Sequence, residues 1–477
     1  MTMCATLGLF PTRLLAILLL LSSETLAQDA IADSPLSLCP DNTHYILFRG
    51  RPTLLIGSTE HYGAVLNSEF DYARYLQTVQ KSELNLTRTF SGAYVEPDGA
   101  FNISHNTLAP DAGKFVAPWA RSDTPGYANG GNKFDLSKWD EGYFRRLHDF
   151  VSQASHRGIV VEIVLFCPYY EEPQWNLSPL NARNNINGVG DIPRTAANTL
   201  KNGNLLAVQD AMVEKFASEL KDFDNIYYEI CNEPYFGGVT LEWQNHIAAV
   251  LSDAEAQFPH RHLIAQNISN GSRKIDEPNK LVSIFNFHYA TPPNAVATNY
   301  ALNKPIADDE TGFKGTGDAI YRMEAWDFFM AGGVIFDHLD YSYTAGHEDG
   351  TFLPLPPKQP GGGSPSLREQ LRILKQFLSN CDFVNMKPDN SVIVSQLPKG
   401  ITARALANEG KEYAIYIRGR GLESLEIRLP AGNYRAQWVE TLSGAADQTL
   451  EFKSESGKAR LIAPKYADDV ALRISKM

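Results

Sequence analysis

Cysteine is scarce in this sequence: there are five in 477 residues, and none stands in a CxxC pair or at zinc-ligand spacing from a histidine. The spacing argues against a zinc site. Cys4 lies in the N-terminal apolar run, and Cys167 and Cys231 each end an apolar segment, which favours buried free thiols. Cys39 and Cys381 flank the larger part of the chain, and the sequence is compatible both with a disulfide between them and with two free thiols.

Basic residues are also in short supply, with 43 Lys and Arg against 55 Asp and Glu and a formal net charge of −12. A protein that binds nucleic acid needs basic patches against the phosphates. The acidic balance therefore argues against a nucleic-acid partner and fits a neutral one.

Long uncharged apolar runs are absent after the N-terminal segment TRLLAILLLLSSETLAQ. In that segment Arg13 precedes the apolar run, and Ala27 occupies the −1 position of a cleavage site. The run has the length of a signal-peptide core and is short for a bilayer span. We therefore expect residues 1–27 to be a secretory signal, with a retained N-terminal anchor as the alternative. The mature chain is expected to have no membrane span and to be secreted or periplasmic.

Apolar segments alternate with helical patterns between about residues 45 and 380. The helical pattern SEFDYARYLQTVQKS is expected to begin at a Ser cap, and the helix that starts with SKWDEG is expected to end at Gly158. Several of the apolar segments are continuous runs, as strands buried on both faces should be. The expected strands cover 53–58, 84–90, 159–166, 226–231, 262–267, 281–288, 304–310 and 333–339.

This alternation predicts an α/β fold of the (β/α)8 TIM-barrel type. A doubly wound sheet is the alternative, but no GxGxxG motif follows the first strand. After Asn380 the helical patterns give way to short alternating strands such as YAIYIRG and NYRAQWVE, which predict a small β-sandwich. The expected organisation is a signal peptide at 1–27, a catalytic barrel at 28–381 and a β-sandwich domain at 382–477.

The fourth expected strand ends abruptly in Asn232-Glu233-Pro234. In a barrel, functional residues gather where the strands end, at the C-terminal face. The amide of Asn232 can both donate to and accept from a sugar hydroxyl, and Pro234 ends the strand. On its own, however, this tripeptide is more typical of an ordinary strand-to-loop turn.

A second carboxylate strengthens the functional interpretation. The seventh expected strand ends in Asp308-Asp309-Glu310, and three neighbouring acids repel one another, which suggests a purpose. Strands four and seven face each other across a barrel, so Glu233 and Glu310 can approach one bond from two sides. Glycoside hydrolysis needs such a pair, one carboxylic acid to protonate the leaving oxygen and one carboxylate to attack or to activate water.

With these residues, the segment from about 45 to 380 resembles glycoside hydrolase clan A, family 5 (cellulase-like) and its relatives. The resemblance implies that Glu233 is the acid/base, that Glu310 is the nucleophile and that hydrolysis proceeds with retention. It also implies that Arg88 keeps the nucleophile ionised and that Asn232 binds the substrate 2-hydroxyl.

The resemblance further implies that His288 and Tyr289, at the end of the sixth strand, position the nucleophile. Each supporting residue also has a purely structural interpretation. Arg88 could be a buried ion-pair partner, and His288 could be a core histidine bonded to the backbone.

The sequence departs from the family pattern at the ends of strands one, three and eight. Glu60 and His61 end the first strand and are candidates for substrate binding, or else form a solvated turn. Near the end of the eighth strand, Asp337 and Tyr343 are further candidates, although Asp337 could instead cap loop amides. Tyr343 follows that strand, where an aromatic platform is usual. These departures bear on the substrate more than on the mechanism.

We therefore predict a secreted retaining glycosidase that cleaves O-glycosidic bonds of a poly- or oligosaccharide, with no cofactor and no metal. One alternative is a non-catalytic carbohydrate-binding barrel. The other is a metal-dependent hydrolase built on Asp308, Asp309 and Glu310 with His288 and His338, although no HxH or HExxH stands at a strand end. The sequence leaves open the sugar, the linkage, endo or exo action and the oligomeric state.

Overall fold

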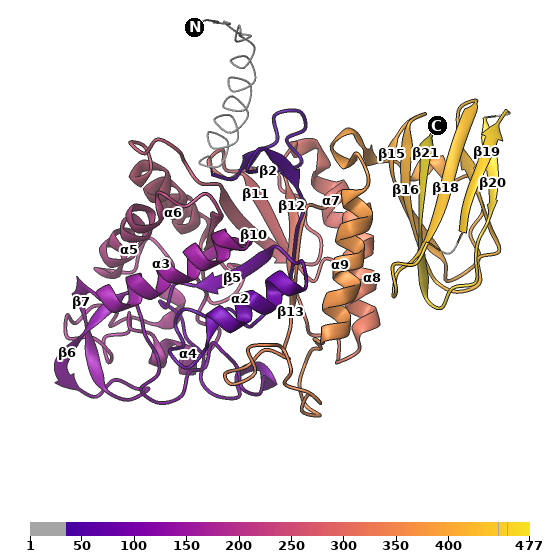
Figure 1. Ribbon diagram of the computed structural model, residues 1–477. Coiled ribbons are helices and arrows are strands. Elements are labelled where there is room, and N and C mark those ends of the chain that lie inside the picture. The colour runs from indigo at the N-terminus through magenta and orange to yellow at the C-terminus, as the bar shows by residue number, and fades with distance from the viewer. Residues whose placement is uncertain (1–34, 447, 456) are drawn as a thin grey trace, which may run out of the picture.

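The computed structural model describes residues 35–446, 448–455 and 457–477. The expected signal segment lies outside the described residues. Eight parallel strands form one sheet in the order β4-β13-β12-β11-β10-β9-β8-β5, with helices around it (Figure 1). The strands are β4 (Leu55–Thr59), β5 (Leu86–Phe90), β8 (Val160–Phe166), β9 (Ile226–Cys231), β10 (Ile264–Asn270), β11 (Ile284–His288), β12 (Ile306–Thr311) and β13 (Ile335–Leu339).

The two edge strands of this sheet, β4 and β5, are joined by Asn85. Its side chain accepts a 2.9 Å hydrogen bond from Ile56 N and donates one of 2.9 Å to Leu54 O, and its backbone N–H bonds to Ile56 O at 3.1 Å. Because a strand edge left open would expose unpaired backbone groups, this junction closes the sheet. The predicted (β/α)8 barrel is therefore confirmed.

Two helices begin at aspartate caps, and not at the positions that the sequence predicted. The first helix after β4 begins at Asp71, whose side chain accepts from two backbone N–H groups, and not at the expected Ser cap. The next begins after Asp140, so the residues from Ser137 to Trp139 are strand and not helix. Gly158 does follow the end of that helix, in the left-handed region at φ 69°. The helices are α2 (Tyr72–Lys81), α3 (Glu141–His156), α4 (Glu172–Leu177), α5 (Leu205–Leu220), α6 (Leu241–Ala254), α7 (Asn294–Asn299), α8 (Asp318–Met330) and α9 (Pro365–Ser379), with short 3₁₀ turns η1 (Ala100–Asn102), η2 (Arg194–Ala196), η3 (Tyr300–Leu302), η4 (Phe383–Asn385) and η5 (Asn390–Val392).

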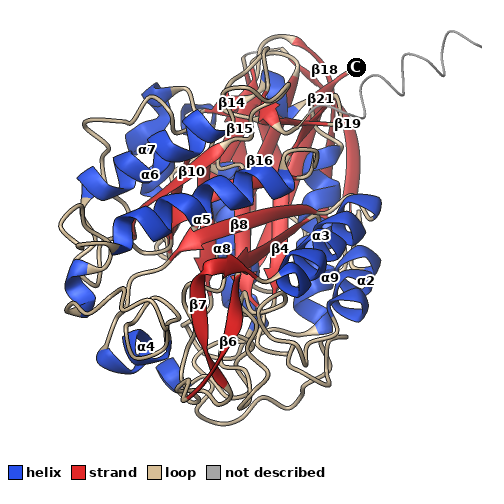
Figure 2. Cartoon of the chain, turned by 90° about the vertical axis from the view of Figure 1, so that its left-hand side faces the viewer, coloured by secondary structure: helices blue, strands red, loops and turns tan. Residues whose placement is uncertain are grey.

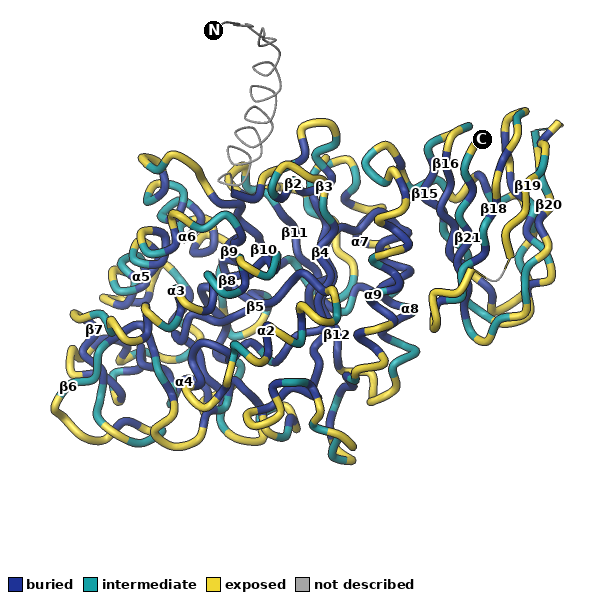
Figure 3. Tube along the Cα trace, viewed as in Figure 1, coloured by how far each residue is buried: buried dark blue, intermediate teal, exposed yellow. Residues whose placement is uncertain are grey.

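Long connections after β5 and β8 extend the C-terminal face of the barrel (Figure 2). The first contains an antiparallel hairpin of β6 (Trp119–Pro125) and β7 (Asn132–Trp139), which the sequence analysis did not predict. The residues before β4 form a small antiparallel sheet of three strands: β1 (Ser37–Leu38), β2 (Ile46–Phe48) and β3 (Arg51–Thr53). Seven of the eight barrel strands are buried along their whole length, and β10 becomes more exposed from Ile268 to Asn270. Other exposed residues gather on helices and loops (Figure 3).

The C-terminal part is an antiparallel β-sandwich, as predicted. Six strands pair in the order β14-β15-β16-β21-β18-β19, and β17 pairs with β20 against an apolar core that includes Leu425, Tyr434 and Leu461. The sandwich packs on α8 through a buried Arg322–Asp469 ion pair of 2.6 Å. The strands are β14 (Lys387–Pro388), β15 (Thr402–Asn408), β16 (Glu412–Arg418), β17 (Ser424–Arg428), β18 (Gly432–Glu440), β19 (Gln448–Ser454), β20 (Lys458–Ile462) and β21 (Asp469–Lys476).

Cys39, Cys167, Cys231 and Cys381 are all buried free thiols. The disulfide that the sequence allowed between Cys39 and Cys381 is therefore not formed in this structure. Within the described ranges, the helices are too short or too polar to cross a bilayer.

Candidate active site

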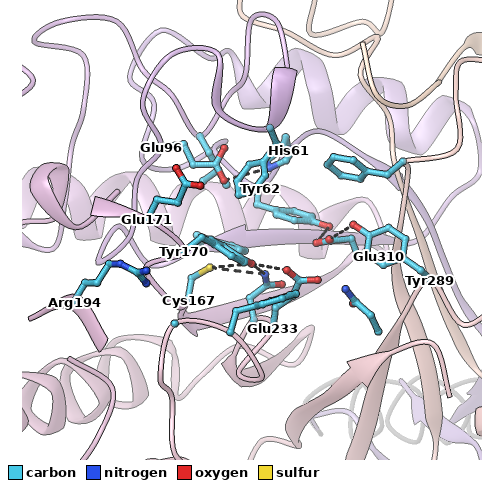
Figure 4. A pocket seen from close by; sticks show the side chains of 18 of the residues that line it. His61, Tyr62, Glu96, Cys167, Tyr170, Glu171, Arg194, Glu233, Tyr289 and Glu310 are labelled. Carbon is cyan, nitrogen blue, oxygen red and sulfur yellow. Dashed lines mark hydrogen bonds and ion pairs between the residues drawn. The ribbon is translucent and has the colours of Figure 1, made fainter. Parts of the chain in front are cut away.

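A cavity of about 720 Å³ opens at the C-terminal ends of the barrel strands (Figure 4). Glu233, from the end of β9, and Glu310, from β12, both line it. Much of its wall is apolar, with Phe90, Phe101 and Leu108 among its members. A concave, largely apolar cavity with a few convergent polar groups is the usual form of a small-molecule site.

The carboxylates of Glu233 and Glu310 lie close together, with His288 between them. The His288 Nδ1 atom is 3.4 Å from Glu233 Oε1 and 3.5 Å from Glu310 Oε1. One oxygen of each carboxylate and a ring nitrogen of His288 all fall within 4.8 Å of one another. Glu233 and Glu310 come from strands on different sides of the barrel, and their carboxylates lie side by side in the cavity, as the strand positions predicted.

Glu310 is held as a carboxylate by a ring of donors. Tyr289 donates to Oε1 at 2.6 Å and Tyr62 donates to Oε2 at 3.0 Å, while Arg88 Nη1 lies 3.5 Å from Oε2. Burial on its own would raise the pKa of Glu310, but the positive charges of His288 and Arg88 and the bonded hydroxyl of Tyr289 outweigh it and lower the pKa below its usual range. Glu310 is therefore ionised over the whole neutral range.

Arg88 and His288 supply this positive charge from beneath the cavity, where both are completely buried. Arg88 Nε lies 2.9 Å from Glu162 and its Nη2 lies 3.2 Å from Glu229, so the guanidinium is enclosed by acids. Burial would lower the pKa of His288, but Glu310 and the contacts with Asp309 and Glu233 raise it well above its ordinary value. The imidazole is therefore a cation between carboxylates.

Glu233 is held by a different set of partners. Tyr170 donates to its Oε2 at 2.6 Å, and Tyr235 lies within 3.1 Å of its Oε1. Asn232 Nδ2 donates to the same Tyr170 hydroxyl at 3.2 Å, and Arg88 donates to Asn232 Oδ1 at 3.2 Å. The arrangement fixes the orientation of both the acid and the neighbouring amide.

Three residues that touch or carry these carboxylates have left-handed backbones. The φ angles are 59° at Tyr62, 37° at Glu233 and 52° at Tyr289. Non-glycine residues adopt this conformation at a cost of the order of 1–3 kcal/mol each, and such residues cluster at functional sites. At these strand ends, the conformation turns the side chains toward the cavity.

Of the residues named from the sequence, the structure places His61, Asn232, Glu233, Tyr289 and Glu310 in the cavity wall. Arg88, from β5, and His288, from β11, lie directly below that wall, in contact with Glu310 and Glu233.

Three other expected binding residues lie elsewhere. Glu60 is buried and accepts bonds from the backbone N–H groups of two loop residues and from Thr107 Oγ1 at 2.5 Å, so it holds the loop after β4. Asp337 is buried inside the barrel and accepts from Thr59 Oγ1 at 2.5 Å. Tyr343 packs edge-on against Tyr75 with ring centroids 4.9 Å apart. The expectation that these three face the substrate is therefore wrong.

Among the cavity and cavity-edge residues that were not predicted as site residues are Tyr62, Glu96, Tyr170 and Tyr235. Tyr170 and Tyr235 stand among the aromatics of the mouth loops in the sequence, but nothing in the local pattern shows which aromatic hydroxyl meets a carboxylate. Glu96 lies in the long connection after β5, and its position depends on how that connection folds back over the barrel.

Among the residues that the structure describes, two groups of side chains have the spacing of a three-ligand metal site, Glu229–His288–Asp309 and Glu233–His288–Glu310. Both use His288, and a histidine must be neutral to bind a metal, whereas this imidazole is surrounded by acids that favour its cation. The set expected for the metal-dependent alternative is not assembled, because Asp308 accepts from Ala290 N at 3.2 Å and His338 lies beside Ser58 at 3.3 Å. The prediction that the site has no metal stays a prediction.

No protein-family model and no curated protein matches this sequence. Solved structures do match the fold. One is a protein assigned as a glycoside hydrolase from Bacteroides vulgatus ATCC 8482, 12% identical, with a TM-score of 0.68 over 94% of this chain and 83% of its own. A glycoside hydrolase family 5 protein from the same strain is 15% identical, with a TM-score of 0.63 over 93% and 94%. A further glycoside hydrolase is 15% identical, with a TM-score of 0.62 over 93% and 97%. The chain therefore shares its overall fold with those proteins.

Proposed function

We propose that the protein is a glycoside hydrolase that cleaves O-glycosidic bonds with retention of configuration. The observation that carries this proposal is the proximity of two carboxylates in one cavity, with an oxygen of Glu233 and an oxygen of Glu310 within 4.8 Å. Retaining enzymes hold their carboxyl groups about 5–5.5 Å apart, and inverting enzymes separate them by about 6.5–9.5 Å to admit a water. The similarity in fold to glycoside hydrolases supports the same class.

The surroundings of the two carboxylates assign their roles. Glu310, which is ionised and flanked by Arg88, is the nucleophile: its carboxylate oxygen bonds to the anomeric carbon as the glycosidic C–O bond breaks. Glu233 gives its proton to the leaving oxygen in the same step. In the second step Glu233 takes a proton from water, the water oxygen bonds to the anomeric carbon, and Glu310 leaves as a carboxylate.

The other residues of the site support these two steps without bonding to the sugar carbon. The hydroxyls of Tyr62 and Tyr289 hold both oxygens of Glu310 in place, so the nucleophile needs little reorganisation before attack. The amide of Asn232, bonded to Arg88 and Tyr170, presents the remaining lone pair of its oxygen for the hydroxyl next to the anomeric carbon.

The expected export of the protein is part of the same proposal. It is supported by the N-terminal segment 1–27, which has the composition of a signal peptide, and it suits an enzyme that acts on polysaccharide outside the cell. N-terminal sequencing of the protein recovered from the medium or periplasm would test it, with a start at Gln28 as the expected result.

Azide rescue tests the roles of the two acids. Glu310→Ala should lose at least about 10⁴-fold in kcat on an activated aryl glycoside, since the nucleophile is absent. Added azide should restore turnover and give a glycosyl azide of inverted anomeric configuration, as seen by NMR. Glu233→Ala should instead give, with azide, a glycosyl azide of retained configuration.

Two outcomes would overturn the proposal. Unchanged turnover in Glu310→Ala would remove the nucleophile assignment, and a first-formed product of inverted configuration from the wild type would remove the retaining mechanism. The surface variant Arg435→Ala serves as a control, because Arg435 lies on β18, far along the chain from either acid, and is 55% exposed.

A further inference from the structure

The cavity wall that lies across from Glu233 in Figure 4 carries a second pair of charged side chains, His61 and Glu96. His61 follows β4, and Glu96 lies on the connection between β5 and β6. Neither residue takes part in the two-step mechanism described above. Their position on the side of Tyr62, which bonds to the nucleophile, puts them beside the sugar whose anomeric carbon reacts.

Glu96 is fixed rigidly by its own loop. Its side chain is 3% exposed; Tyr94 donates to Oε1 at 3.1 Å and Asn106 Nδ2 donates to Oε2. An ionised carboxylate has about four lone-pair sites, so these two bonds leave about half of its accepting capacity unused. A carboxylate that is this well anchored and still lines a cavity can accept from a ligand without losing its supports.

His61 faces Glu96 across a gap. Its Nε2 lies 3.8 Å from Glu96 Oε1, which is too far for a hydrogen bond, and its Nδ1 is buried without a partner. Burial would lower the pKa of His61, but the nearby negative charges of Glu96, Glu310 and Glu60 raise it. A cationic donor and an anionic acceptor therefore stand close together without direct contact.

A hydroxyl group of a ligand in the cavity beside this pair can accept from one partner and donate to the other at the same time. Bonds to charged partners are also stronger than bonds between neutral groups. A sugar hydroxyl that accepts from His61 Nε2 and donates to Glu96 Oε1 would satisfy both side chains.

The charges elsewhere in the cavity bear on the kind of sugar. Arg194 donates to Tyr169 O at 2.7 Å and lies 3.5 Å from Glu172, while Lys314 pairs with Glu324. The arginine and the lysine of the cavity wall thus each have an acidic neighbour, and the remaining cation, His61, faces Glu96. A sugar carrying a carboxylate would meet Glu96, Glu233 and Glu310 and no cation that lacks an acidic neighbour, which is unfavourable.

We propose that His61 and Glu96 recognise one ring hydroxyl of the sugar on the nucleophile side of the scissile bond, and that this sugar is neutral and not a uronic acid. This inference rests on the proposed function. It names residues that select the substrate, whereas Glu233 and Glu310 perform the reaction.

The test compares aryl glycosides of neutral sugars with the matching aryl uronides, and then the best neutral glycoside with its monodeoxy analogues. For the wild type, we expect turnover of a neutral glycoside and at least about 10-fold lower kcat/KM on its uronide. One monodeoxy analogue should lose about 10- to 100-fold in kcat/KM, the range for a hydrogen bond to a charged group.

In Glu96→Gln and in His61→Gln, kcat/KM for the parent glycoside should fall by a similar factor. In both variants that one deoxy analogue should then react as well as the parent glycoside does. The matched control is Asp98→Asn, which removes a negative charge from the same loop at an exposed position and should keep the full deoxy penalty. Either of the first two variants suffices if the other fails to fold, as judged by its Tm.

If every deoxy analogue lowered kcat/KM by the same factor in the wild type and in the variants, the proposed role of His61 and Glu96 would be wrong. If the wild type preferred uronides, the proposal that the sugar is neutral would be wrong. Calorimetric binding of the same glycosides to Glu233→Gln separates this inference from the mechanism. A deoxy penalty in binding that depends on Glu96, without turnover by the wild type, would support the recognition pair and reject the hydrolase. Absence of binding to any glycoside would reject both.

Discussion

Tyr62 donates a 3.0 Å hydrogen bond to Oε2 of Glu310 from a left-handed position directly after β4. The Tyr62 ring also lies 4.4 Å from the guanidinium carbon of Arg88, so one side chain contacts both Glu310 and a cation that lowers the pKa of Glu310. Burial raises the pKa of the Tyr62 hydroxyl well above its ordinary value, and the phenol therefore remains a donor at every pH of interest.

Replacing Tyr62 with Phe should move the acidic limb of the pH profile of kcat/KM to higher pH. The lost hydroxyl stabilises the carboxylate form of Glu310, so its removal raises the pKa of that acid and more of the enzyme is protonated at low pH. The loss of kcat should be about 10-fold, within the range for a hydrogen bond to a charged group. Phe352→Leu on an outer loop is the control and should leave the profile unchanged; a shift of the acidic limb to lower pH would contradict this account.

Arg88 should be essential for folding stability as well as for activity. Its guanidinium is completely buried against Glu162 and Glu229. Arg88→Met would leave these carboxylates without their cation, and breaking a buried pair from one side lowers the free energy of unfolding by about 3–5 kcal/mol. Urea unfolding followed by tryptophan fluorescence measures the change.

The matched control for that measurement is Arg435→Met, which removes an exposed arginine from its surface pair with Glu451. Exposed pairs contribute about 0–1 kcal/mol, so the control should unfold near the wild-type midpoint. An Arg88→Met variant as stable as this control would show that the buried acids are neutral in the absence of arginine.

The barrel strands could be predicted because they bury both faces. The expected strand at 226–231 coincides with β9 (Ile226–Cys231), and the polar residues that end these runs mark the C-terminal face. The residues Asp308 to Glu310 could be placed at that face, but not the direction of each side chain. Asp337 is an example of a side-chain direction that the sequence could not predict. It is only two residues from the end of β13, yet it points into the barrel and accepts a hydrogen bond from Thr59.

The loops could not be predicted in the same way. The hairpin of β6 and β7 has a tip rich in glycine and polar residues, and its alternation is weak. The site contacts of Tyr62 and Glu96 depend on a left-handed backbone and on Asn106 from a distant part of the loop. Such contacts are set by tertiary packing, and local sequence carries no periodicity that reports them.

His338 should make the protein less stable as the pH falls from about 6.5 to about 4. Burial, more than the neighbouring charges, lowers the pKa of this imidazole to about 4, and its ring lies 4.2 Å from the ring of Tyr321. The unfolded chain binds a proton to this histidine at higher pH than the folded chain does, so acid favours unfolding.

The size of this effect is of the order of 3 kcal/mol between the two ends of that pH window. Because many carboxylates also titrate there, the comparison is between the wild type and His338→Asn, by urea unfolding at a series of pH values. The wild type should lose more stability than the variant as the pH falls. Parallel curves would mean that His338 is as easily protonated in the folded state as in the unfolded one.

Tyr170 is expected to control which oxygen of Glu233 carries the transferable proton. The phenol has one hydrogen, and because Asn232 donates to its oxygen, that hydrogen is directed at Glu233 Oε2 at 2.6 Å. Oε2 is then an acceptor, so a proton on Glu233 is directed to Oε1. The Tyr235 oxygen can accept that proton at 3.1 Å when the single Tyr235 hydrogen is donated to Asn270 Oδ1. Tyr170→Phe removes this constraint and leaves the acid free to protonate at either oxygen.

The defect should therefore depend on the leaving group. Glycosides with poor leaving groups need the acid, so Tyr170→Phe should reduce their kcat by about 10- to 100-fold, a part of the whole contribution of a general acid. Aryl glycosides with good leaving groups leave without a proton and should be affected less than about 3-fold. Tyr169→Phe is the matched control, because its hydroxyl bonds to Ser178 and to the Ala93 carbonyl and not to either catalytic acid. If Tyr170→Phe slowed both kinds of glycoside by the same factor, its hydroxyl would shape the cavity without directing the proton.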